Sequence, residues 1–294
     1  MMILEWLKAV LYGIVEGITE WLPVSSTGHL ILLQDWLPFR FTSDPILLAE
    51  FGEMFEVVIQ LGAILAVVIL FWGKLWPFSK KKTAQEKRNT WSIWLKVIVA
   101  SIPAAFVGIV LDKVLEALTS RDINDWLYNS IVVAAMLIVY GVAFILIEHF
   151  HKGKEARISS LEEIDCKTAF CVGLFQALSI VPGTSRSGST ILGSMLLGLS
   201  RTAGAEFSFF MAIPAMVGAS GIKILGFLGY VWDSSAAIPV DAWIVLAVGC
   251  VVSFVVSLVA IRFLMDFLKK HSFASFGVYR ILLGILVLLF WALR

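Results

Sequence analysis

Charged residues are scarce in this sequence, which limits the kinds of protein that it can encode. Only 15% of the 294 residues are charged, against about a quarter in typical soluble domains. The net charge is +1, so the chain lacks the basic field that attracts nucleic acid, which is excluded as a partner. Three cysteines are too few for a disulfide framework or a thiolate metal site and are expected to fill apolar space.

Long apolar runs stand where the charges are missing. Hydrophobic residues make up 59% of the chain, and the mean hydropathy is +0.90. A bilayer core is crossed by about 20 apolar residues, and six runs qualify: 54–73, 94–111, 131–148, 206–230, 242–265 and 278–293. Together with two interrupted apolar stretches described below, they leave no room for a separate soluble domain, so 1–294 is predicted to be a single membrane domain in contact with membrane lipid. Arg280 and Tyr279 are expected to anchor the last run at the membrane interface.

Two further apolar stretches, 9–33 and 168–199, are interrupted near their middles. The interruptions are LPVSSTGH at 22–29 and VPGTSRSGST at 181–190. Irregular backbone cannot face lipid, because its unpaired N–H and C=O groups would cost several kcal/mol each. We therefore predict two re-entrant helix-loop-helix hairpins whose loops are buried in protein or line a wet cavity. The N-terminal stretch lacks the basic region and cleavage site of a signal peptide, so the chain is expected to be the mature protein.

The distribution of Lys and Arg supports these hairpins. Loops 74–96, 149–167 and 266–277 are the more basic ones and are predicted to be cytoplasmic, whereas 34–53, 112–130 and 231–241 carry few basic residues. These assignments alternate over the six spans only if each broken stretch returns to the side from which it entered. The first hairpin is then expected to enter from outside and the second from the cytoplasm.

The two halves of the chain also resemble each other. Residues 13–28 (GIVEGITEWLPVSSTG) resemble residues 173–188 (GLFQALSIVPGTSRSG). Halves 1–150 and 151–294 each hold one hairpin and three spans, and an odd number of spans inverts one half relative to the other. The predicted fold is thus an all-α polytopic membrane protein of two inverted-topology repeats, with six spans in total. Such repeats bring their broken helices together, so the two loops are expected to face each other.

The first broken stretch carries two acids and several hydroxyls. Glu16 and Glu20 are four residues apart, on one face of a helix expected to end at Pro23. Carboxylates inside a membrane are costly and are functional by default, although a wet helix end is the alternative. His29 is expected to act as a base or proton shuttle rather than as a core histidine. The hydroxyls, which suit an anion at a helix start, belong to Ser25, Ser26 and Thr27.

The second broken stretch adds a fixed positive charge, Arg186. A guanidinium forks onto phosphate or carboxylate oxygens, although a structural ion pair with Glu16 or Glu20 is the alternative. The polar residues around it are Ser185, Ser187, Gly188 and Thr190. Together the two loops fit phosphoryl chemistry on a phosphorylated lipid, in which the acids hold a divalent cation that bridges phosphates.

Two stretches carry a resemblance to a known family. EGITEWLPVSSTGH at 16–29 and PGTSRSG at 182–188 closely resemble the two signature motifs of the undecaprenyl-diphosphatase family, also called the bacitracin-resistance protein. FEVVIQLGAILAVV at 55–68 and SRTAGAEFSFFMAIP at 200–214 are similar to its other characteristic stretches. The resemblance covers essentially the whole chain.

The resemblance implies hydrolysis of undecaprenyl diphosphate to undecaprenyl phosphate and inorganic phosphate, which recycles the lipid carrier for peptidoglycan synthesis and confers bacitracin resistance. It also implies a bacterial plasma (inner) membrane enzyme with its site on the periplasmic side and a divalent cation, Mg²⁺ or Ca²⁺, held by Glu16 and Glu20. By position, Ser26 matches the family's candidate nucleophile, His29 its partner and Arg186 the phosphate-binding arginine.

Three alternatives stay open on the sequence. Ser26 attacks the terminal phosphorus while His29 manages its proton and Glu20 orients His29, or a water molecule attacks directly. The protein is a phosphatase, or it is a transporter or flippase of a phosphorylated polyprenyl lipid, since inverted repeats are common in transporters. It acts alone or as a homodimer.

Overall fold

The structure of the protein is a computed structural model that describes residues 2–119, 127 and 129–293. Part of the predicted outer loop 112–130 therefore lies outside the described residues. In the described part the regular elements are helices, joined in one place by an isolated parallel bridge between Ile158 and Leu199. The predicted all-α class is confirmed.

Six helices among the described residues are long and apolar enough to cross a membrane, and each overlaps one predicted run. Their bounds are α3 (Pro45–Leu70), α5 (Ala84–Thr119), α7 (Ser130–His151), α10 (Arg201–Ser234), α11 (Val240–Leu268) and α12 (Ala274–Ala292). Helix α3 begins well before its apolar run because Asp44 caps it. The Asp44 side chain accepts hydrogen bonds from the N–H groups of Ile46 and Leu47, which have no partner inside the helix.

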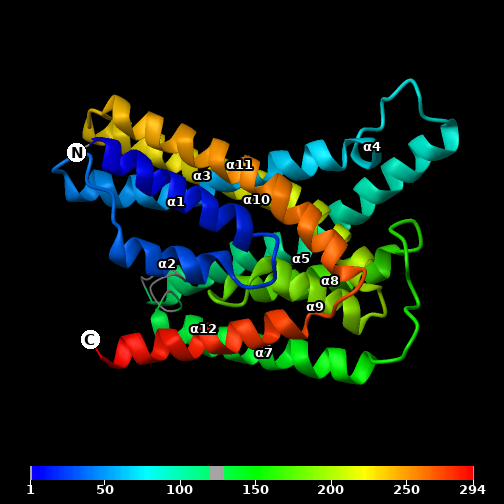
Figure 1. Cartoon of the computed structure of the whole chain (residues 1–294). Helices are drawn as coiled ribbons and strands as arrows, with labels where there is room; N and C mark the ends of the chain where they lie inside the picture. Colours follow the sequence, from blue (N-terminus) through cyan, green and yellow to red (C-terminus); the bar gives the residue numbers. More distant parts are fainter. Residues whose placement is uncertain (1, 120–126, 128, 294) are drawn as a thin grey trace. The chain divides into compact units, whose positions relative to one another are not determined.

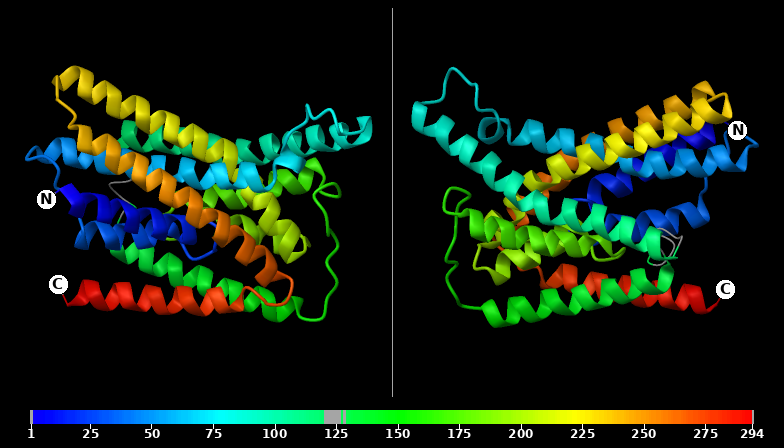
Figure 2. Two further views of the ribbon diagram at one scale, coloured as in Figure 1. Left: turned by 45° about the horizontal axis from the view of Figure 1, so that its top comes forward. Right: turned by 180° about the vertical axis from the view of Figure 1, so that it is seen from behind.

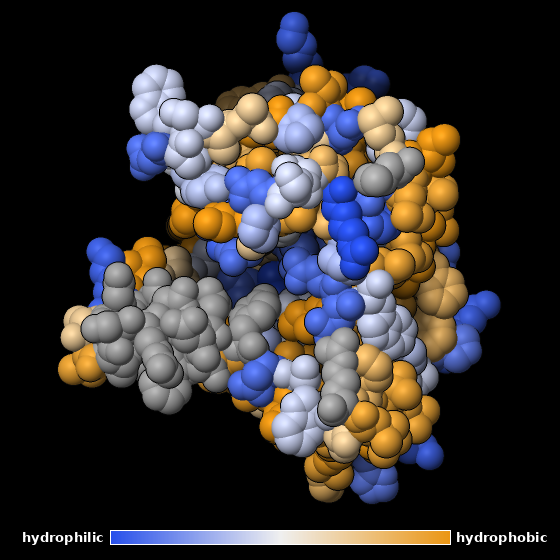
Figure 3. All heavy atoms as spheres, turned by 90° about the vertical axis from the view of Figure 1, so that its left-hand side faces the viewer, coloured by the Kyte–Doolittle hydropathy of each residue, from blue (hydrophilic) through white to orange (hydrophobic). Residues whose placement is uncertain are grey.

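Large apolar side chains remain exposed along these helices. Ile222 and Leu225 of α10 are each 72% exposed, and Val259 of α11 is 65% exposed. In Figure 3, apolar side chains gather along the right-hand side of the face shown. Soluble proteins rarely expose apolar surface on this scale, so these side chains suit contact with lipid tails.

The two broken stretches each form two helices joined by a loop, as predicted. The helices are α1 (Met2–Thr19) and α2 (Ser26–Trp36) in the first stretch, and α8 (Cys166–Ala177), the short 3₁₀ helix η1 (Leu178–Ile180) and α9 (Arg186–Leu196) in the second. The prediction that the first helix ends at Pro23 is wrong, because α1 ends at Thr19. The backbone N–H of Glu20 still donates to the carbonyl of Glu16 (3.0 Å), so the two acids keep their helical spacing.

A buried ion pair closes the first hairpin. Lys8 Nζ donates to Glu5 Oε1 (2.8 Å) and to the carbonyl of Pro38 (2.6 Å). The other oxygen of Glu5 accepts the backbone N–H of Arg40 (3.0 Å). Because Pro38 and Arg40 follow α2, the chain returns to the point at which α1 began.

Backbone hydrogen bonds close the second hairpin in the same way. The N–H groups of Arg157 and Ile158 donate to the carbonyl of Gly198 (2.9 and 3.0 Å), and the N–H of Ser200 donates to the carbonyl of Ile158 (2.8 Å). Asp165 then caps α8 by accepting the N–H of Thr168 (2.7 Å), and this backbone bond lowers the pKa of the Asp165 carboxyl. The segment before α8 thus meets the segment after α9, and the second stretch also doubles back.

The chain folds into two compact units. Unit 1 comprises Met1–Trp21, His29–Phe71 and Ala212–Arg262, and unit 2 comprises Leu22–Gly28, Trp72–Met211 and Phe263–Arg294. Each unit takes segments from both predicted halves, 1–150 and 151–294. The division into two repeat halves within one membrane domain stays a prediction.

Each hairpin packs on a spanning helix through a glycine. In unit 1, a Cβ added at Gly13 of α1 would lie 2.7 Å from the carbonyl oxygen of Gly249 in α11. In unit 2, a Cβ added at Gly173 of α8 would overlap the carbonyl oxygen of Ala100 in α5. Small residues at such contacts let membrane helices approach closely. Gly13 and Gly173 occupy matching places in the two similar stretches of sequence.

Helices α7 and α12 of unit 2 run side by side (Figures 1 and 2). They meet at Gly141 and Gly277, where a Cβ on either residue would lie within 2.7 Å of the other's carbonyl oxygen. The contact is therefore reciprocal, and it brings two helix backbones together without a side chain between them.

Candidate active site

The two interrupting loops contact each other within unit 2. Ser187 Oγ donates to the carbonyl of Leu22 (3.5 Å). The Arg280 guanidinium donates to the carbonyls of Pro23 (3.0 Å), Gly183 (2.7 Å) and Thr184 (2.9 Å). The predicted approach of the two loops is confirmed for Leu22 and Pro23 of the first loop and for Gly183, Thr184 and Ser187 of the second.

The loops share an unusual local geometry at the start of the helix that follows each of them. Ser25 and Ser185 have φ angles of 74° and 70°, in the left-handed region that costs a non-glycine residue about 1–3 kcal/mol. The hydroxyl of Ser25 accepts the N–H of Gly28 (3.4 Å), and that of Ser185 accepts the N–H of Gly188 (3.1 Å). Such strain is concentrated at binding sites, so both turns are candidates for ligand contact.

The loops place hydroxyls, an arginine and two helix starts in one unit. Helix α2 begins at Ser26 and α9 at Arg186, and helix N-termini present N–H groups and a positive dipole end to an anion. Ser26 is 8% exposed. The predicted site residues that unit 2 brings together are Ser25, Ser26, Thr27, Ser185, Arg186, Ser187, Gly188 and Thr190.

Arg186 is supported by α10. Its Nη1 donates to the carbonyl of Ser208 (2.8 Å) and to the Ser208 hydroxyl (3.4 Å). The Ser208 hydroxyl also bonds to the hydroxyl of Thr190 (2.6 Å). Ser208 was missed as a site residue, because a single serine in an apolar run gives no signal beyond its place in the stretch 200–214.

The two acids and the histidine belong to unit 1. Glu16 is fully buried, Glu20 is 4% exposed, and His29 is half-buried. His29 follows Ser26 by three residues in α2, so both lie on one face of that helix. The ion pair considered between Arg186 and either acid stays a hypothesis.

A divalent cation fits these acids only with help from a ligand. The described residues contain no group of three or more His, Cys, Asp or Glu side chains that could hold a metal ion. Mg²⁺ is commonly held by one or two carboxylates together with the phosphates of a substrate. Glu16 and Glu20, on successive helical turns, provide such a pair, so the donor set suits a cation whose remaining ligands come from a phosphorylated substrate.

Gly183 sets the path of the second loop. Its φ is +86°, and a Cβ there would lie 2.5 Å from the carbonyl oxygen of Val133 in α7. We expect Gly183→Ala to lower the free energy of unfolding by about 3 kcal/mol, from left-handed strain plus overpacking. The measurement is the apparent melting temperature in detergent.

Gly153→Ala is the matched control for this substitution. Gly153 has a similar φ of +77°, but nothing lies within 4 Å of its added Cβ, so only the backbone strain of about 1 kcal/mol is expected. Equal losses in the two variants would show that the contact with Val133 does not constrain the loop.

Arg280 is not the interface anchor that the sequence predicted; that prediction is wrong. The side chain is fully buried, and its guanidinium lies over the ring of Tyr140, 5.4 Å from the ring centroid. Burial is tolerated because three backbone carbonyls of the two loops accept its N–H groups.

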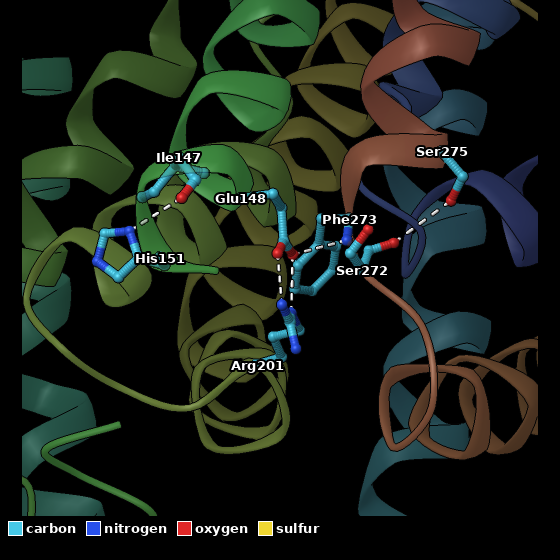
Figure 4. Close-up of polar contacts among 7 residues, drawn as sticks. All are labelled: Ile147, Glu148, His151, Arg201, Ser272, Phe273 and Ser275. Atoms are coloured by element: carbon cyan, nitrogen blue, oxygen red, sulfur yellow. Dashed lines mark hydrogen bonds and ion pairs between the residues drawn. The ribbon is translucent and has the colours of Figure 1, made fainter. Parts of the chain in front are cut away.

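A second polar cluster of unit 2, built around the buried side chain of Glu148, is structural (Figure 4). Arg201 Nε donates to Glu148 Oε1 (2.8 Å), and its Nη2 donates to Oε2. The backbone N–H of Phe273 also donates to Glu148 Oε1 (2.8 Å). Both oxygens of the Glu148 carboxylate are thereby occupied, and the cluster joins the end of α7 to the start of α10 and to the residue before α12.

These features define a multi-pass α-helical membrane protein with a polar site at two paired, broken helices. The chain belongs to the bacitracin resistance protein BacA family, whose model matches residues 9–286. It is 49% identical over 292 residues to an undecaprenyl-diphosphatase of Enterococcus faecalis, covering 99% of this chain and 98% of the relative. It is 50% identical over 292 residues to one of Streptococcus thermophilus (99% and 95% covered) and 47% identical over 288 residues to one of Acetivibrio thermocellus (98% of each).

Proposed function

We propose that the protein hydrolyses undecaprenyl diphosphate to undecaprenyl phosphate and inorganic phosphate. The observation that carries the proposal is the pairing, in one compact unit, of two hydroxyl-rich loops that each open a helix, one of them with Arg186. The names of the relatives support the same reaction. Its product would return to peptidoglycan synthesis as the lipid carrier, and this recycling would confer bacitracin resistance.

In the proposed mechanism Ser26 is the nucleophile. Its Oγ attacks the terminal phosphorus, the bond from that phosphorus to the bridging oxygen breaks, and undecaprenyl phosphate leaves. Water then attacks the phosphoserine, which releases inorganic phosphate and regenerates the hydroxyl. His29, one turn along α2, takes the serine proton and later activates the water, and Glu20 orients His29. Direct attack by water on the diphosphate is the competing route.

The remaining site residues manage negative charge. The Arg186 guanidinium and the N–H groups at the starts of α2 and α9 stabilise the phosphoryl oxygens in the transition state. The turns that bind the diphosphate are lined by Ser25, Thr27, Ser185, Ser187, Gly188 and Thr190. A divalent cation, Mg²⁺ or Ca²⁺, would be held by Glu16 and Glu20 and would neutralise charge on the phosphates when bound.

We propose that the site faces the periplasm from the bacterial plasma (inner) membrane, with both hairpins re-entrant and the two halves inverted relative to each other. The matching contacts of Gly13 on α11 and Gly173 on α5 support the repeat, as do the matching φ angles of Ser25 and Ser185. Each hairpin would then pack on the second span of the opposite half. Assembly as a homodimer stays a prediction.

The test is phosphate release by the purified protein. In detergent, we expect release from undecaprenyl diphosphate that stops with a chelator and returns with Mg²⁺ or Ca²⁺. Glu20→Ala and Arg186→Ala are each expected to lower kcat by about 10²–10³-fold, the loss typical of removing one charge-stabilising group. The controls are Glu155→Ala and Arg88→Ala, which remove exposed side chains of the same types and should leave kcat unchanged.

The outcome also decides between the enzyme and a transporter. Paired broken helices occur in transporters, and such a protein would bind undecaprenyl diphosphate without releasing phosphate. Binding without release, under conditions in which the protein is folded, would favour a transporter or flippase of a phosphorylated polyprenyl lipid.

A further inference from the structure

One side chain, Arg280 of α12, holds both interrupting loops. Its Nη1 donates to the carbonyl of Pro23 (3.0 Å), and its Nη2 donates to the carbonyls of Gly183 (2.7 Å) and Thr184 (2.9 Å). The planar guanidinium presents its donors in a fixed fork. The distance between the two loop backbones is therefore set by one rigid group.

The charge of Arg280 is retained at a high cost. The side chain is fully buried, and in the described part of the chain no carboxylate contacts it and its Nε has no hydrogen-bond partner. The Tyr140 ring, 5.4 Å away, compensates only part of the desolvation. A buried cation without a counter-ion is costly, so a neutral side chain of similar volume would fill the same space at a lower cost in free energy.

The cation also lies at the turn expected to bind phosphate. A Cβ added at Gly188 would lie 2.9 Å from Arg280 Nη1. Gly188 belongs to the first turn of α9, where Ser185 accepts its N–H (3.1 Å). The positive charge of Arg280 thus adds to that of Arg186 and of the helix start.

We propose that Arg280 is a positioning residue for the reaction. It fixes the two loops in one arrangement through their backbone carbonyls, so that Ser26 and Arg186 are aligned for a diphosphate before it binds. Its positive charge also strengthens the field at the same turns, where it stabilises the negative charge that develops on the phosphoryl oxygens in the transition state. This inference rests on the proposed function for its catalytic consequence but not for the link between the loops.

The experiment compares Arg280→Met and Arg280→Lys with wild type, using amide hydrogen exchange of residues 22–28 and 183–190 and the kcat and KM of phosphate release. In Arg280→Met we expect exchange to rise in both loops together and kcat to fall about 10²-fold with KM changed less than about threefold, because a displacement of about 1 Å has that effect. Arg280→Lys should recover about tenfold of the lost kcat, since an ammonium keeps the charge but not the fork. Arg262→Met, which removes an exposed arginine of α11, is the matched control.

Three results would overturn the proposal. Unchanged exchange in either loop would mean that Arg280 does not join them, and a raised KM with unchanged kcat would mean that it binds substrate instead of positioning the loops. Wild-type protein that releases no phosphate would refute the proposed function, and the exchange measurement would still decide whether Arg280 joins the loops. If Arg280→Met does not fold, Arg280→Lys decides: wild-type exchange and wild-type kcat in that variant would refute the proposal.

Discussion

Ser26→Ala is expected to lower the rate of phosphate release by about 10⁴-fold, because it removes the attacking oxygen while the charge-stabilising groups remain. The hydroxyl stands at the first position of α2 and is almost completely buried. Its removal leaves the backbone N–H groups of the turn in place, so binding of the lipid should persist. The measurement is kcat in detergent, with binding of undecaprenyl diphosphate measured in parallel.

A trapped intermediate distinguishes the two routes. Acid quenching of wild-type protein during turnover, followed by mass spectrometry, should find phosphoserine at residue 26. Ser220→Ala is the control variant for Ser26→Ala and should keep wild-type turnover. Ser220 is a buried serine whose hydroxyl donates to the carbonyl of Val57 (3.0 Å), and it takes no part in the proposed reaction. Near-full turnover by Ser26→Ala would establish direct attack by water.

Arg201→Ala is expected to lower the free energy of unfolding by about 3 kcal/mol, because it leaves a buried carboxylate without its cation. The side chain of Glu148 is 5% exposed. After the substitution, the N–H of Phe273 would be the one remaining hydrogen-bond donor to this carboxylate among the described residues. The apparent melting temperature in detergent measures this loss of stability. At a temperature well below it, where the variant is folded, kcat should stay close to the wild-type value.

The exposed ion pair of Lys269 and Asp266 offers a matched comparison for the pair of Arg201 and Glu148. Lys269 pairs with Asp266 (2.7 Å), but their side chains are 63% and 75% exposed, so Lys269→Ala should cost at most about 1 kcal/mol. The double variant Glu148→Leu with Arg201→Met should regain much of the lost stability, since neither charge is then buried alone. A double variant no more stable than Arg201→Ala would mean that the carboxylate is not the cause.

The sequence was sufficient where the physics is local. An apolar run of span length is expected to lie in lipid, and an interruption by Pro, Gly and Ser is expected to end a helix. The six long helices and the two helix pairs of the broken stretches therefore followed directly. The approach of the loops followed from the resemblance between residues 13–28 and 173–188. Helix boundaries were placed less well, because α1 ends at Thr19 and not at Pro23, and α3 and α5 begin several residues before their apolar runs.

The contacts that fix the site were not predictable in this way. Arg280 is joined to carbonyls of Pro23 and Gly183, and every residue carries a carbonyl, so no residue type marks its partners. Glu148 and Arg201 are separated by a whole hairpin, and their pairing depends on how α10 follows α9. A basic residue near the end of an apolar run has the same pattern whether it meets water or a buried loop, which explains why Arg280 was assigned to the interface.

The close contact between α7 and α12 widens the set of positions on which activity depends. Gly141 and Gly277 leave no gap between the two backbones, so any larger residue there must spread the pair. Val133 of α7 supports Gly183, and Arg280 of α12 joins both loops, so spreading would shift both supports at once. A genetic screen for inactive protein should therefore recover changes at small residues that never touch the lipid or its phosphates.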